Sequence, residues 1–185
     1  MSRARWAGRV LVAIIAAVFA IDLAGVIENW NHLRPVAAGA SAPAFELPRI
    51  GPRGRIGPER LSLESLRGQV VIIDFWETWC RPCRESMPVV EQVVGERDGE
   101  VVLLSVCSDG TRQSREARRL VDELAPGAQL VADDGAVADG YGVGTIPHLV
   151  VVGRDGAVVH VHRRYSGPAA LERDLRAAVD RALER

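Results

Sequence analysis

The feature that most constrains the fold is a pair of short apolar runs, each followed by a segment of helical periodicity. Residues 70–75 are interrupted only by Asp74, and residues 101–106 have the same apolar character. Both runs therefore predict strands that are buried on both faces of a sheet. Residues 84–94 and 117–124 carry apolar side chains three and four positions apart, as amphipathic helices do. This alternation predicts an α/β domain.

The carboxyl-terminal part supplies the rest of the sheet. Residues 146–152 form a third apolar run, and the dipeptide Asp155-Gly156 predicts a turn into a hairpin partner over residues 157–163. A last helix is expected from Pro168, because its large apolar residues recur every four positions: Leu171, Leu175, Val179 and Leu183. The order β-α-β-α-β-β-α predicts a central mixed sheet with helices on both faces.

The segment ahead of this core carries weaker signals. Residues 44–47 predict a short strand, and the Gly- and Pro-rich residues 48–60 predict a loop. Residues 61–68 predict a short helical turn that ends at a glycine.

The amino terminus predicts a membrane anchor. Three arginines in residues 1–9 precede an apolar stretch, residues 10–28, whose length is close to that needed to cross about 30 Å of hydrocarbon. By the positive-inside rule residues 1–9 are cytoplasmic, and the chain crosses the cytoplasmic membrane once. Residues 29–42 then form an Ala-, Gly- and Pro-rich tether, and residues 43–185 form an extracytoplasmic (periplasmic) domain. Two alternatives stay open: a cleaved signal peptide and a buried helix of a soluble protein.

The charge of the chain excludes one class of partner. The formal net charge is −1, which gives no reason to expect nucleic-acid binding. The arginines of the second predicted helix alternate with apolar positions on a helical period and so indicate a solvated face: Arg112, Arg115, Arg118 and Arg119.

Two of the three cysteines, Cys80 and Cys83, stand at the expected start of the helix that follows the first buried run. A helix amino terminus offers unpaired N–H groups and partial positive charge, and both favour a thiolate over a thiol. Cys80, nearest the helix end, is therefore the expected nucleophile, and Cys83 is expected to resolve the mixed disulfide. Arg81 adds a cation between them.

Three other uses of a cysteine pair are possible in principle. Structural zinc needs four ligands, and the chain has no second cysteine pair, while His148, His160 and His162 lie far along the sequence. A static disulfide would close a very short loop and stabilise little. A copper(I) chaperone could use the two thiolates as soft ligands. Electron transfer is favoured, with the dithiol as its own redox group and neither a separate cofactor nor a metal. The third cysteine, Cys107, ends a predicted strand and is expected to be a small buried hydrophobe.

The motifs FWETWCRPC (residues 75–83), Pro88 and TIP (residues 145–147) resemble the thioredoxin superfamily. More closely, the chain is similar to the membrane-anchored, extracytoplasmic TlpA/ResA-like thiol-disulfide oxidoreductases, over roughly residues 40–184. The resemblance implies a thioredoxin-like fold and a protein disulfide reductase. Its partners would be substrate proteins with disulfides or thiols and a membrane-bound, thiol-reducing electron donor.

The resemblance also implies roles for individual residues. Pro147 would be a cis-proline facing the cysteine pair, and it would present the backbone of Ile146 to the substrate in β-like pairing. Trp79 would form an apolar lip beside the site, and Arg81 and Pro82 would contribute to the substrate-binding surface.

Asp74 matches the buried acid of thioredoxin, which helps to deprotonate the resolving cysteine. Many relatives of this layout carry a glutamate three residues after the second cysteine, where this chain has Ser86, and Glu85 stands one place earlier. Asp74 is therefore expected to supply the acid at this site.

By family analogy, the substrates would belong to cytochrome c maturation or to metal-site assembly. One alternative is a maturation factor dedicated to a single dehydrogenase, as in methylamine utilisation. The non-enzymatic alternative remains the Cu(I)-handling chaperone.

Overall fold

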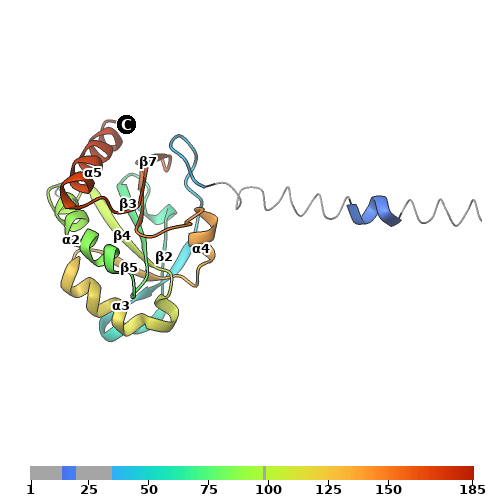
Figure 1. Cartoon of the computed structure of the whole chain (residues 1–185), viewed down its shortest axis with the longest axis horizontal. Helices are drawn as coiled ribbons and strands as arrows, with labels where there is room; N and C mark the ends of the chain where they lie inside the picture. Colours follow the sequence, from blue (N-terminus) through green and yellow to red (C-terminus); the bar gives the residue numbers. More distant parts are fainter. Residues whose placement is uncertain (1–13, 20–34, 98) are drawn as a thin grey trace, which may run out of the picture. The chain divides into compact units, whose positions relative to one another are not determined.

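The computed structural model describes residues 14–19, 35–97 and 99–185. Residues Pro35–Arg185 form one compact unit around a seven-stranded mixed sheet, in the strand order β2-β1-β5-β4-β3-β6-β7 (Figure 1). The elements, in chain order, are β1 (Glu46–Ile50), η1 (Pro52–Gly54), β2 (Ile56–Ser62), η2 (Glu64–Leu66), β3 (Val70–Trp76), α2 (Arg81–Gly95), β4 (Val101–Cys107), α3 (Gly110–Leu124), β5 (Gln129–Ala132), α4 (Ala136–Gly140), β6 (His148–Val152), β7 (Val158–Arg163) and α5 (Pro168–Leu183).

The apolar runs form the centre of the sheet, as predicted. All seven residues of β3 are buried, and β3 pairs in parallel with β4 and antiparallel with β6. Successive side chains of a strand point to opposite faces. Ile72 and Trp76 therefore pack in the core layer beneath α2, while Ile73 and Phe75 pack in the layer on the opposite face.

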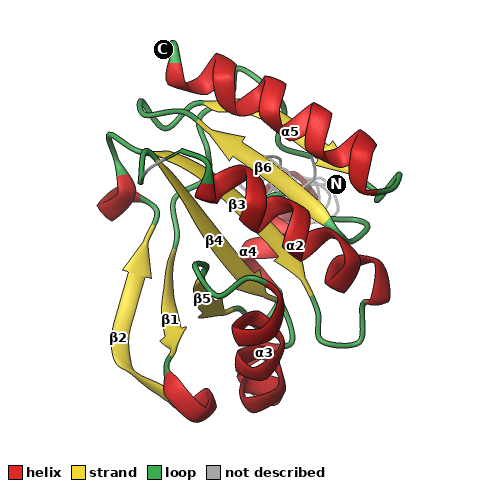
Figure 2. Ribbon diagram, turned by 90° about the vertical axis from the view of Figure 1, so that its left-hand side faces the viewer, coloured by secondary structure: helices red, strands yellow, loops and turns green. Residues whose placement is uncertain are grey.

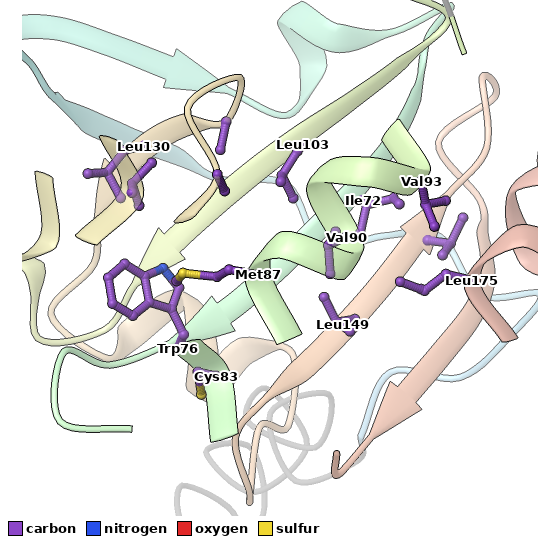
Figure 3. Packing of buried hydrophobic residues seen from close by; sticks show 14 of the residues in the cluster. Ile72, Trp76, Cys83, Met87, Val90, Val93, Leu103, Leu130, Leu149 and Leu175 are labelled. Carbon is purple, nitrogen blue, oxygen red and sulfur yellow. The ribbon is translucent and has the colours of Figure 1, made fainter. Parts of the chain in front are cut away.

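The two faces of the sheet are covered differently. Buried residues of α2, α3 and α5 share one hydrophobic cluster with the sheet, and α4 packs on the other face (Figure 2). Figure 3 shows Met87, Val90 and Val93 of α2 beside Ile72 of β3 and Leu149 of β6. The predicted mixed sheet with helices on both faces is confirmed for residues 35–185.

The predicted loop over residues 48–60 is wrong in part, because β1 extends to Ile50 and Ile56–Ser62 form strand β2. A strand can contain Pro58 here because β2 is at the edge of the sheet, where a missing N–H costs no ladder hydrogen bond. Two further elements, β5 and α4, were not predicted. The third run begins its strand at His148 rather than at Ile146.

Most of the predicted anchor, residues 10–13 and 20–28, lies outside the described residues. Residues 14–19 are helical, and no helix among the described residues is long and apolar enough to cross a membrane.

The described part of the expected tether packs on the domain. The backbone N–H of Val36 donates to the carbonyl of Tyr141 at 3.2 Å, and that of Gly39 donates to Val158 at 2.8 Å. Val36 is also buried in the core layer that contains Tyr141. The folded unit therefore includes residues 35–42.

Candidate active site

Cys80 and Cys83 are joined by a disulfide at the start of α2. Cys80 is the N-cap residue, and its Sγ accepts a hydrogen bond from the backbone N–H of Cys83 at 3.2 Å. The helix forms here because Pro82 fits the first turn, where no N–H partner is needed. Cys83 is fully buried and Cys80 is 3% exposed. The sequence-based placement of the pair at a helix start is confirmed.

The loop before Cys80 is held by an aspartate that sequence reasoning missed. Asp109 accepts hydrogen bonds from the Thr78 N–H at 3.1 Å and from the Thr78 hydroxyl at 2.5 Å. The parallel register pairs Trp76 with Cys107, so the segments after β3 and β4 leave the same edge of the sheet. The sequence signal that could have found Asp109 is an acidic residue just after the second of two neighbouring parallel strands.

Asp74 is 1% exposed and lies in the middle of the sheet, opposite Ser105 of β4 and Leu149 of β6. It lies between Ile72 and Trp76 on the same face of β3, so its side chain points toward the layer that contains the cysteine pair. Its Oδ1 has no hydrogen-bond partner among the described residues. Burial raises the pKa of this carboxyl from 3.8 to about 7. The expected burial of Asp74 is confirmed.

The segment before β6 packs against the core layer that contains the pair. The Ile146–Pro147 peptide bond is cis, as the resemblance implied. Ile146 packs against the hydrophobic cluster that includes both cysteines, and Pro147 is buried. The Pro147 carbonyl accepts a hydrogen bond from the backbone N–H of Arg164 at 3.3 Å.

The side chains around the disulfide make an accessible rim. Trp79 is 68% exposed, and its indole N–H donates to the carboxylate of Glu77. Pro82 is exposed, and Arg81 forms an exposed ion pair with Glu85 at 3.1 Å. Glu85 therefore points into solvent, away from the core.

Ser86 and Cys107 have structural rather than catalytic roles. Ser86 is fully buried, and its hydroxyl donates to the Cys83 carbonyl at 2.9 Å, so this position offers no acid. Cys107 is a free buried thiol that donates to Asp109 Oδ1 at 3.0 Å. Burial and the neighbouring carboxylate raise the pKa of Cys107, which keeps it protonated and unreactive.

A nucleophile at a helix amino terminus, a buried partner cysteine and a rim open to proteins define a thiol-disulfide oxidoreductase with a thioredoxin-like fold. The chain belongs to the AhpC/TSA family, whose model matches residues 38–161.

Similar proteins share the class. The thioredoxin-like protein YneN of Bacillus subtilis is 24% identical over 156 residues, which are 80% of this chain and 88% of YneN. The thiol-disulfide oxidoreductase ResA of Oceanobacillus iheyensis is 28% identical over 153 residues, 82% of this chain and 76% of ResA. A crystal structure from Chlorobium tepidum, described as a thiol:disulfide interchange protein DsbE, matches with a TM-score of 0.67 and 26% identity and covers 80% of this chain and 99% of its own.

Proposed function

We propose that this protein reduces disulfides in partner proteins on the extracytoplasmic side of the cytoplasmic membrane, with residues 10–28 as its anchor. The observation that carries the proposal is the position of Cys80 Sγ at the N-cap of α2, together with the burial of Cys83 and of Asp74 on the same side of the sheet. An N-cap position stabilises the thiolate, which is the attacking species in disulfide exchange.

The reaction takes place in two exchange steps. The Cys80 thiolate attacks a sulfur of the substrate disulfide, a mixed disulfide forms, and the first substrate thiolate leaves and takes a proton. Cys83 then attacks Cys80 Sγ and releases the second substrate thiol. The substrate gains two electrons and two protons, and the enzyme becomes the Cys80–Cys83 disulfide.

Asp74 is the group that accepts the proton of Cys83 in the second step. A general base works best when its pKa is near the operating pH, and burial brings the Asp74 pKa to about 7. Ser86 carries no ionisable group, so it cannot replace Asp74 in this role.

The rim and the Pro147 segment hold the substrate chain. Trp79 offers an exposed apolar surface beside the disulfide, with Arg81 and Pro82 next to it. No described residue forms a backbone hydrogen bond with Ile146, so its N–H and C=O are available to pair with an extended substrate segment.

A reductase outside the cytoplasm needs a source of electrons, because that compartment is oxidising. We assign this role to a thiol-reducing donor in the membrane. The resemblance to the TlpA/ResA-like oxidoreductases suggests substrates in cytochrome c maturation or metal-site assembly.

Mixed-disulfide trapping tests the proposal. Full-length protein carrying Cys83→Ser should accumulate dithiothreitol-sensitive adducts through Cys80 with extracytoplasmic proteins that contain a disulfide. Adducts with a single dehydrogenase would identify a dedicated maturation factor instead. The control is Cys80→Ser with Cys83→Ser, which keeps only the buried Cys107. No adducts, together with tight Cu(I) binding by the wild-type dithiol, would contradict the reductase and favour the copper chaperone.

A further inference from the structure

Strand β7 and helix α5 bring together three metal-ligating side chains that the redox chemistry does not use. His160 and His162 are two residues apart on β7, so their rings leave the same side of the strand, where α5 packs. Asp174 on α5 lies between them: its Oδ2 is 2.9 Å from His160 Nε2 and 2.5 Å from His162 Nδ1. The three ligand atoms all lie within 4.8 Å of one another.

We propose that His160, His162 and Asp174 bind a divalent transition-metal ion, with Cu²⁺ bound more tightly than Zn²⁺. Two imidazoles and one carboxylate suit these ions, and their relative affinity follows the Irving–Williams order. The hard carboxylate and the absence of sulfur in the set disfavour Cu(I). This site is separate from the cysteine pair and does not depend on the proposed reductase function.

Metal binding requires the ligand atoms to adjust, above all the Asp174 carboxylate. With metal–ligand bonds of about 2.1 Å, tetrahedral ligands lie about 3.4 Å apart. The Asp174 oxygen is closer than that to both ring nitrogens, so it must withdraw by about half an ångström or more. Asp174 can do so because its side chain is 38% exposed, and solvent on that side provides the fourth ligand.

One local feature limits the affinity. A metal on His162 Nδ1 leaves the ring proton on Nε2, and Nε2 is buried with no hydrogen-bond partner in the part of the chain that the structure describes. Metal-bound histidines usually donate that second N–H to an acceptor. We therefore expect micromolar binding, weaker than in closed four-ligand sites.

The position of the site between β7 and α5 predicts that a bound metal stabilises the fold. His162 pairs with Leu149 on β6, and two residues later the Arg164 N–H bonds the carbonyl of Pro147. A bound ion would fasten α5 to β7 and stabilise the folded state. At a hundredfold excess of metal over Kd, the melting temperature should rise by about 5–10 °C.

The test uses the full-length protein with its cysteine pair oxidised, so that the pair offers no thiolate. This protein is titrated with Cu²⁺, and separately with Zn²⁺, in competition with a chromogenic chelator. We expect one equivalent of each metal, nitrogen hyperfine structure in the Cu²⁺ electron paramagnetic resonance spectrum, and a higher melting temperature. His162→Gln and Asp174→Asn should each weaken binding at least tenfold. The control Asp180→Asn changes another carboxylate of α5, which pairs with Arg97, and should leave binding unchanged.

Circular dichroism of the metal-free variants checks that they are folded. Binding at the wild-type level in folded His162→Gln and Asp174→Asn would overturn the proposal, and so would the absence of stoichiometric Cu²⁺ binding by the wild type at micromolar concentration.

Discussion

Asp74→Asn removes a buried ionisable group while keeping the shape of the side chain, and it should change how stability depends on pH. Burial raises the pKa of Asp74 from 3.8 to about 7. Between these two values the folded protein holds a proton that the unfolded chain releases. The stabilisation linked to this proton is therefore complete below pH 4, decreases as pH rises through the window, and is lost above pH 7. At 1.36 kcal/mol for each pH unit, the loss amounts to about 4 kcal/mol.

The assay is urea unfolding of the oxidised full-length protein from pH 4.5 to 8.5. Relative to wild type, Asp74→Asn should gain about 2–4 kcal/mol of unfolding free energy at pH 8 and little at pH 4.5. His148 contributes a slope of opposite sign, because burial lowers its pKa to about 4 and stability is lost as pH falls from 6.5 to 4. That slope is common to both proteins and cancels in the difference.

The matched control is Asp139→Asn, which changes an exposed carboxylate on α4. It should leave the pH profile of the wild type unchanged. The reasoning about Asp74 would be refuted if Asp74→Asn kept the wild-type pH dependence, or if it were less stable than wild type at pH 8.

Three other substitutions should separate structural from functional residues. Cys107→Ala should keep full disulfide-reductase activity and lose about 1–2 kcal/mol in urea unfolding, because the buried, protonated thiol packs in the core and donates one hydrogen bond to Asp109 but takes no part in disulfide exchange. Asp109→Ala should lose about 2–3 kcal/mol and slow reduction of protein disulfides, because Thr78 loses both of its bonds to this carboxylate. Trp79→Ala should change stability by less than about 0.5 kcal/mol, because the ring is mostly exposed, but it should lower kcat/KM for protein substrates more than for a small disulfide, because the ring is proposed to contact the substrate chain.

The sheet core was predictable because burial on both faces leaves a direct signal in the sequence. The runs that form β3 and β4 are apolar almost throughout. In α2 the apolar residues keep their helical spacing although the helix contains Pro82 and Pro88. Strand β2 left no such signal, because five of its seven residues are exposed at the sheet edge and its sequence contains Gly57 and Pro58. The four residues of β5 are too few to show a period.

The site was predictable where its residues are close in sequence and not where the fold brings them together. The cysteine pair, Asp74 and their helix come from one segment. Asp109 reaches Thr78 only through the parallel register of β3 and β4, which no local pattern encodes. In the same way, His160 and His162 were visible as a His-x-His pair, but Asp174 joins them only because α5 folds back over β7.

The reduction potential of the Cys80–Cys83 couple tests the proposed direction of electron flow most directly. It can be measured on the full-length protein by equilibration with dithiothreitol redox buffers and alkylation of the free thiols. We expect a value near that of thioredoxin, about −270 mV, because the couple must be able to reduce its substrates. A value near −120 mV, as in the strong oxidant DsbA, would contradict a reductase and make this protein a donor of disulfides.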